Sequence, residues 1–302
     1  MRPLVLGLLV AVGSLSVAVA GNQAPPAAPV LPDLVRVKDN LYVIEGTNPR
    51  PDRAFFTGGT IGVLVTDAGV VLVDTKLANY GSQILDRIRK VTDKPVITVI
   101  NTHTHGDHTG SNEAFPAPVE IVAHESTLTN MAKLPAFAGD KAHFLPKRTF
   151  QDRLSLVRGT DRIELYYFGR GHTNGDAFIY YPAQRVLQTG DMWQWRDAPS
   201  LDVNNGGSGV EFPQTLAKAL ATLRDVDVVI PGHAGLTTLA SLEEFQRFTA
   251  DLLAAAQSGF KTGQTSDQVA ASVATSLAGQ YPGYRFDVVK PAIDAIYGEL
   301  KK

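Results

Sequence analysis

Residues 101–110 read Asn-Thr-His-Thr-His-Gly-Asp-His-Thr-Gly, with three histidines and one aspartate within six positions. The run ends the β-branched segment 95–101, which predicts a buried strand. Histidines two positions apart diverge on a helix, so we expect an extended loop that Gly106 can bend. The candidate metal ligands in this loop are His103, His105, Asp107 and His108. Their density predicts a metal site rather than a solvated polar loop.

Three more candidate ligands stand where further strands should end. They are His172 in Gly-Arg-Gly-His-Thr-Asn-Gly-Asp, Asp191 in Thr-Gly-Asp and His233 in Pro-Gly-His. Loops at one edge of a layered α/β protein converge, so we expect these residues to meet the first cluster. The chain has no cysteine, so every metal ligand has to be His, Asp or Glu. His124 and His143 lack the spacing and are not assigned to the metals.

Strands and helices alternate on both sides of the motif. Strands are predicted at residues 34–45, 60–65, 70–74, 95–101, 119–123, 162–168, 177–181, 186–189 and 226–230, and helices at 77–90, 126–133 and 213–223. From residue 241 the pattern is helical, in three stretches separated by 259–266 and 281–284. Mixed β and βα units predict a layered α/β domain.

The chain divides into four parts. Residues 1–20 form an apolar run behind Arg2 that ends on small residues, which is typical of a secretory signal peptide cleaved after Ala20. A retained anchor helix is the alternative, although the run is at the short limit for a membrane span. A Pro-rich linker (21–33), a main domain (34–240) and a helical extension packed on it (241–302) follow. We expect a periplasmic or secreted protein without a lipid anchor, because no lipobox cysteine exists.

Composition limits the classes of partner. The 302 residues are 44% hydrophobic, which is enough for a sizeable core, and the formal net charge is -2. This balance provides no broad basic field for nucleic acid or anionic lipid. We therefore expect a small-molecule substrate, no nucleic acid, and no membrane contact beyond the signal segment.

The His-x-His-x-Asp-His run with the downstream His, Asp and His strongly resembles the metallo-β-lactamase superfamily over residues 34–240. The resemblance implies a four-layer αββα sandwich with metals at the open edge of two facing sheets. Carried over by position, it implies that His103, His105 and His172 bind a first metal, that Asp107, His108 and His233 bind a second, and that Asp191 bridges them. Asp74, which ends the strand 70–74, matches a buried aspartate that supports the ligands from behind.

The residue types agree with that assignment. Imidazoles suit zinc, and a bridging carboxylate lets two cations lie about 3.5 to 4 Å apart around a shared hydroxide. Zinc lowers the pKa of its water to about 7, so a nucleophile exists at neutral pH. Asp107 is the catalytic candidate, because it can orient that hydroxide and pass its proton to the leaving group. Iron and manganese also accept such a mixed ligand set.

The bridging position narrows the reaction class. Familiar β-lactamases of the superfamily carry cysteine or serine there, whereas Asp191 resembles glyoxalase II and related esterases and lactonases. The flavodiiron branch has a Glu at the position of His105, so redox chemistry is not expected. The leading hypothesis is an exported dinuclear zinc hydrolase that cleaves the acyl bond of a lactam, lactone or ester by a metal-bound hydroxide.

Two alternatives remain open at this point. The first is a glyoxalase II type thioesterase, disfavoured by export away from cytosolic glutathione and by the lack of an evident basic clamp near the C-terminus. The second is a non-catalytic periplasmic protein that binds metal, disfavoured by the full ligand set with its bridge.

Substrate-binding candidates lie beside the ligands. Arg170 and Asn174 flank His172, where either can polarise a substrate carbonyl or bind a carboxylate. Trp193 and Trp195 follow Asp191 closely and, with residues 55–56, can line an apolar pocket. Packing in the core is the alternative for these aromatic residues.

Overall fold

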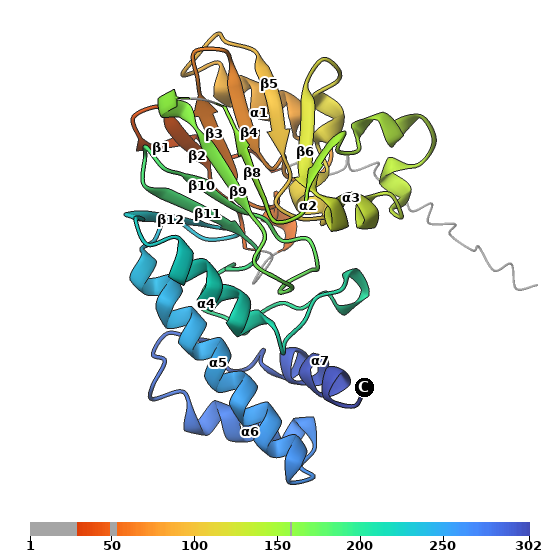
Figure 1. The fold of residues 1–302 in the computed structure, drawn as a ribbon, viewed down its shortest axis with the longest axis vertical. Helices are drawn as coiled ribbons and strands as arrows, with labels where there is room; N and C mark the ends of the chain where they lie inside the picture. The colour runs from red at the N-terminus through yellow and green to blue at the C-terminus, as the bar shows by residue number, and fades with distance from the viewer. Residues whose placement is uncertain (1–28, 49–52, 158) are drawn as a thin grey trace, which may run out of the picture.

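The computed structural model describes residues 29–48, 53–157 and 159–302, in which two β-sheets lie face to face (Figure 1). The predicted signal peptide and most of the predicted linker lie outside the described residues. None of the helices in the described part is long and apolar enough to cross a membrane.

The first sheet contains seven strands in chain order: β1 (Leu34–Lys38), β2 (Leu41–Ile44), β3 (Ile61–Val65), β4 (Val70–Val73), β5 (Val96–Ile100), β6 (Glu120–His124) and β7 (Arg148–Phe150). The second has the order β12 (Val228–Pro231), β11 (Val186–Gly190), β10 (Phe178–Tyr181), β9 (Ile163–Tyr166) and β8 (Arg153–Leu156). Strands β4 to β7 run parallel, as do β11 and β12, whereas the other pairs are antiparallel.

Strand β4 shows why the sheets stack. Val71 and Val73 face the second sheet and pack in the central core, whereas Val70 and Leu72 face outward. The outward side is covered by α1 (Gly81–Ile88), whose Ile84 is fully buried there. Because both faces are covered, the strand is apolar throughout rather than alternating.

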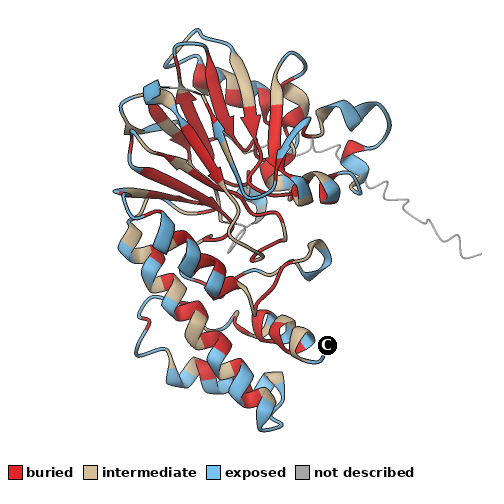
Figure 2. Ribbon diagram, in the orientation of Figure 1, coloured by how far each residue is buried: buried red, intermediate tan, exposed pale blue. Residues whose placement is uncertain are grey.

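Helices cover the outer face of the second sheet in the same way. Leu187 and Val229 pack there against α4 (Phe212–Thr222) and α5 (Leu239–Lys261). Beyond α5, helices α6 (Ser266–Ser276) and α7 (Lys290–Leu300) enclose a further apolar cluster (Figure 1). Figure 2 shows the strands as mostly buried and the outer helix faces as exposed. The αββα sandwich with C-terminal helices is thus confirmed; the domain boundaries stay a prediction.

Some elements differ from the sequence-based expectation. The segment 34–45 forms two strands rather than one, and β7 and β8 were not predicted, because strands of three and four residues are too short to show a period. Helix α1 begins at Gly81 instead of residue 77. Asp74, Lys76 and Asn79 adopt positive φ angles of 68°, 66° and 71°, which a continuous helix does not permit.

Candidate metal centre

All seven predicted ligands lie at one edge of the two sheets. His103 and His105 follow β5, Asp107 and His108 lie on the short helix α2 (Gly106–Thr109), His172 lies between β9 and β10, Asp191 follows β11, and His233 follows β12. The carboxyl ends of parallel strands meet at the same edge of a sheet, which explains the convergence. The predicted bend at Gly106 is the start of a helical turn.

The ligands form two groups. In the first group, one nitrogen each of His103, His105 and His172 and one oxygen of Asp191 lie within 4.8 Å of one another. In the second group, the same holds for Asp107, His108 and His233. The structure therefore brings together the two triads that the resemblance implies.

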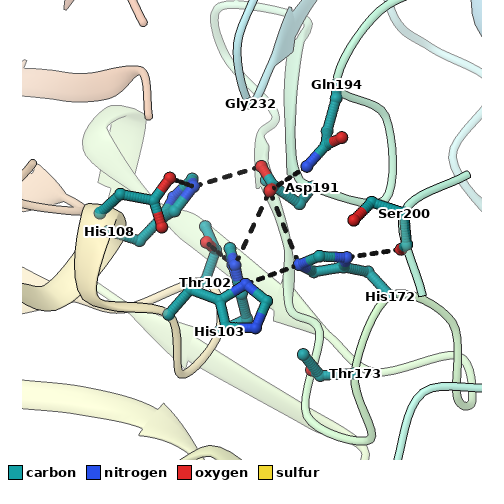
Figure 3. A network of polar contacts seen from close by, with 12 residues as sticks. Thr102, His103, His108, His172, Thr173, Asp191, Gln194, Ser200 and Gly232 are labelled. Carbon is teal, nitrogen blue, oxygen red and sulfur yellow. Dashed lines mark hydrogen bonds and ion pairs between the residues drawn. The ribbon is translucent and has the colours of Figure 1, made fainter. Parts of the chain in front are cut away.

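Asp191 lies between the two groups (Figure 3). Its Oδ2 is 3.6 Å from His172 Nε2 and 3.9 Å from His103 Nε2. Its Oδ1 is 3.2 Å from His108 Nε2 and 3.3 Å from His233 Nε2. Each carboxylate oxygen thus faces a different group, which is the geometry that a bridging ligand requires.

In three of the imidazoles, the ring nitrogen that faces away from the centre makes a hydrogen bond to a neighbouring residue. His105 Nε2–H donates to Asp202 Oδ2 at 2.7 Å, His172 Nδ1–H to the Ser200 carbonyl at 2.7 Å, and His233 Nδ1–H to the Thr47 carbonyl at 3.0 Å. Such bonds fix the tautomer and the orientation of a metal-binding imidazole. These partners were missed from the sequence, because nothing in the local spacing of Ser200 or Asp202 points to a histidine far away in the chain.

Asp74 lies behind both groups and is fully buried. Its Oδ2 is 2.8 Å from His108 Nδ1 and also accepts the Thr102 hydroxyl at 2.8 Å. That hydroxyl is 3.0 Å from His103 Nδ1, and Asp74 Oδ1 accepts the Thr102 backbone N–H at 2.8 Å. One carboxylate therefore contacts an imidazole of the second group directly and one of the first group through a hydroxyl.

The arrangement fits metal ions. His105 Nδ1 and His172 Nε2 are 2.9 Å apart. The other nitrogen of each ring donates a hydrogen bond to a neighbouring residue, so the nitrogen that faces the centre carries a lone pair and no proton. Within the described chain, His103 Nε2 and Asp191 Oδ1 are buried without a hydrogen bond. Buried polar atoms normally have partners, so lone pairs that point at one another indicate a cation site.

Electrostatics distinguish the groups. Burial lowers the pKa of His103 well below its usual value and also lowers the pKa of His105. Burial acts in the same direction on His108 and His233, but Asp191 and Asp107 outweigh it, so that the pKa of His108 rises well above its usual value and that of His233 rises to about 9. These directions describe the protein without bound metal.

Two glycines permit the close approach of these loops. A Cβ atom at Gly232, just before His233, would lie 2.1 Å from Asp191 Oδ1. A Cβ at Gly59 would lie 2.1 Å from the ring of His108. Any side chain at either position would displace a ligand, which explains the glycine in Pro-Gly-His.

A buried lysine lies under the ligand loop and was also missed. Lys76 is fully buried, and its ammonium donates to the carbonyls of Glu45 at 2.5 Å and Gly58 at 3.4 Å. Burial lowers the pKa of Lys76 to about 7, against the attraction of Asp107, Glu45 and Asp74. Lys76 thus places a basic group close to several carboxylates.

A cleft of 580 Å³ opens beside both groups of ligands. Among the residues that line it are His105, Asp107, His172, Asp191 and His233. A substrate in this cleft would contact any metal held by these residues. Phe56, one of the predicted aromatic residues, also lines the cleft, whereas Phe55 is 69% exposed.

The structure does not bring the predicted polar substrate-binding residues to the cleft. Arg170 donates to Glu211 Oε1 at 3.0 and 2.8 Å and lies beside α7. Asn174 accepts a hydrogen bond from Asn130 at 2.8 Å. Both flank His172 in the chain, but neither is among the residues that line the cleft.

The two tryptophans likewise lie outside the cleft. Trp193 is 3% exposed and packs in the core against Phe245, which is the alternative that the sequence left open. Trp195 lines a separate pocket of 490 Å³, with its ring centre 6.3 Å from that of His233. His124 caps α3 (Glu125–Met131), and His143 is exposed on a 3₁₀ helix; neither is in a ligand group.

The comparisons with known proteins agree with this geometry. Residues 54–233 match the family described as the metallo-beta-lactamase superfamily. A metallo-beta-lactamase type 2 from Bacillus sp. (strain 170) is 29% identical over 172 residues, which span 57% of this chain and 65% of that protein. The chain therefore belongs to the metallo-β-lactamase superfamily and has a candidate metal site.

Solved structures show the same fold. A metallo-beta-lactamase from Pontibacter korlensis superposes with a TM-score of 0.61 at 20% identity, covering 72% of this chain and 98% of that one. A double mutant of the sec-alkyl sulfatase PisA1 superposes with a TM-score of 0.71 at 16% identity, covering 89% of this chain and 50% of that one. The larger coverage shows that the fold likeness extends beyond the sandwich.

Proposed function

We propose that the protein is an exported dinuclear zinc hydrolase that cleaves the acyl bond of a lactam, lactone or ester. The observation that carries the proposal is the position of Asp191, whose two oxygens face different groups of imidazoles. A structural zinc site is normally closed by four protein ligands. Seven ligands in two groups beside an open cleft instead favour a catalytic site.

The ligand set supports zinc. His103, His105 and His172 would hold one ion, Asp107, His108 and His233 the other, and Asp191 both. Bound zinc would supply Lewis acidity and lower the pKa of a coordinated water to about 7. Iron and manganese also accept imidazole and carboxylate ligands, so elemental analysis identifies the native metal.

Asp107 is the residue that we propose moves the proton. It lines the cleft, and its side chain is 19% exposed. Burial raises the pKa of Asp107, but His108 and His233 outweigh this effect and bring the pKa to about 2. The carboxylate is therefore ionised at neutral pH, where it can accept a proton from the attacking water and return it to the leaving group.

The zinc-loaded protein should be assayed on lactams, lactones, esters and an acyl glutathione thioester. Hydrolysis that disappears on chelation and returns with zinc would support the proposal. Preference for the glutathione thioester would favour the glyoxalase II type instead. Bound metal without turnover of any substrate would favour a non-catalytic metal-binding protein.

Export rests on the sequence pattern of residues 1–20 alone. The mature protein, isolated from the periplasm or medium of a bacterial host, should begin at Gly21. Cytoplasmic protein that retains Met1 would overturn this part of the proposal.

A further inference from the structure

Part of the cleft lining forms an apolar wall. Its side chains come from three places in the chain: Phe56, Leu77, and the segment 134–144, which contributes Leu134, Ala136, Phe137 and Phe144. Ligands of both metal groups line the same cleft. A molecule whose reactive bond lies at the ligands therefore has its remaining part against hydrocarbon.

The segment 134–144 is fastened to the ligand loop. It contains the 3₁₀ helices η3 (Pro135–Phe137) and η4 (Gly139–Phe144) and joins α3 to β7. Lys141 pairs with Glu113 at 2.8 Å, and Asn112 donates to the Phe144 carbonyl at 3.5 Å. Both partners lie on η2 (Asn112–Ala114), immediately after α2, so the wall is tied to the helix that carries Asp107.

The described part of the cleft lining is also poor in positive charge. Among the described residues that line it, the charged side chains outside the metal groups are Lys141 and Glu113, and these neutralise each other. β-Lactam antibiotics carry a carboxylate, and glutathione thioesters carry two. Within the described wall such a carboxylate would meet no unpaired cation, and an unpaired charge against apolar surface is costly.

From this lining we infer that the substrate is a neutral ester or lactone with an extended alkyl or acyl chain, which lies along Phe56, Leu77 and the segment 134–144. The inference rests on the proposed hydrolase function and selects among its substrates. Each methylene of such a chain that leaves water should improve binding about threefold to fourfold.

Hydrolysis by the zinc-loaded protein should be measured on 4-nitrophenyl esters from acetate to decanoate, beside a chromogenic cephalosporin and S-lactoylglutathione. We expect kcat/KM to rise at least about tenfold from acetate to octanoate. The two carboxylate-bearing substrates should be slower than octanoate. A flat chain-length profile, or a preference for the cephalosporin, would overturn the inference while leaving the hydrolase proposal intact. A preference for S-lactoylglutathione would overturn the inference and would favour the glyoxalase II type as well.

Two variants of matched size and charge test the wall directly. Ala136 and Ala142 are both exposed and lie on η3 and η4 of the same segment, but only Ala136 lines the cleft. Ala136→Glu should reduce the ratio of octanoate to acetate hydrolysis by about tenfold, because it places a charge beside the chain. Ala142→Glu should leave the ratio unchanged. Equal effects of the two variants would contradict the assignment.

A binding measurement separates this inference from the proposed function. Alkyl hydroxamates join a metal-binding head to a chain of variable length, and their binding needs no turnover. Calorimetry on zinc-loaded protein should show affinity that increases with chain length and that Ala136→Glu weakens for the long members. If this holds while no lactam, lactone or ester is hydrolysed, the hydrolase proposal fails alone. Affinity independent of chain length would overturn the apolar wall as a binding surface.

Discussion

The two groups of candidate metal ligands both face Asp191 but differ in charge. In the first group, burial lowers the pKa of His103 and His105, so these imidazoles are neutral and ready to bind metal at neutral pH. In the second group, carboxylates overcome burial and raise the pKa of His108 and His233. A metal that enters the second group must therefore displace protons.

The difference follows from where the carboxylates lie. Asp107 belongs to the second group and is 3.3 Å from His233, and Asp74 is 2.8 Å from His108. In the first group, Asp202 contacts His105 only at Nε2, the ring nitrogen that faces away from the other ligands. A group with three imidazoles and a group with two imidazoles and Asp107 thus lie side by side, with Asp191 facing both, and they should respond differently to mutation and pH.

The largest effect is expected where the groups meet. Asp191→Ala removes the carboxylate that faces both, so it should weaken both metals and reduce activity by roughly 100-fold or more. Metal content and kcat/KM should be measured together. His143→Ala is the control, since His143 is exposed and outside both groups, and it should leave metal and activity nearly intact. Similar losses in the two variants would contradict the assignment.

Lowering the pH should release the metal ion of one group before that of the other. Protons compete with metal once the pH falls below the pKa of an imidazole. The raised pKa values of His108 and His233 make the second group lose its ion first, whereas the lowered values of His103 and His105 let the first group hold its ion to lower pH. Zinc per chain after equilibration at successively lower pH should fall from about two to about one before falling further. Release in a single step would remove the distinction.

Substitution of Asp74 should affect both groups, because Asp74 contacts His108 directly and His103 through the Thr102 hydroxyl. Asp74→Asn keeps the size of the side chain but removes the charge that faces His108 and the Thr102 hydroxyl. We expect activity to fall about 10- to 100-fold while metals still bind. Elemental analysis beside steady-state kinetics tests this. Wild-type kinetics in the variant would show that Asp74 does not position the ligands.

Asp202 should affect the first group alone and by less. Asp202→Asn weakens the hydrogen bond that orients His105, so the affinity of one metal should fall about tenfold while the other is retained. Cobalt substitution would report this, because the absorption of only one of two sites should change. Changes in both sites would indicate that the loop around Asp202 has rearranged as a whole.

The sequence predicted the ligands, because each stands in a short motif at the end of a predicted strand. Four ligands of the His-rich loop lie within six positions, and the other ligands follow apolar strands and glycines, so strand ends placed them at one edge. The supporting contacts could not be predicted in the same way. Asp202 reaches His105 across 97 positions, and Thr47 reaches His233 across 186, through loops without regular periodicity.

The substrate wall was missed for a related reason. Phe137 lies in the short 3₁₀ helix η3 and Leu134 directly precedes it, and in such a short element apolar residues follow neither a helical nor a strand period. The tryptophans drew attention by their closeness to Asp191 in the chain, yet Trp193 turns into the core. Position at the end of a strand therefore predicted the ligands well, whereas proximity in sequence predicted the cleft lining poorly.

The central claim is that both groups bind metal and that hydrolysis depends on it. Zinc should be titrated into the metal-free mature protein while bound zinc per chain and hydrolysis of a 4-nitrophenyl ester are followed in the same samples. We expect binding to saturate at about two zinc ions per chain, with activity absent before the titration and maximal at its end. Saturation clearly below one zinc, or undiminished hydrolysis by the metal-free protein, would contradict the account.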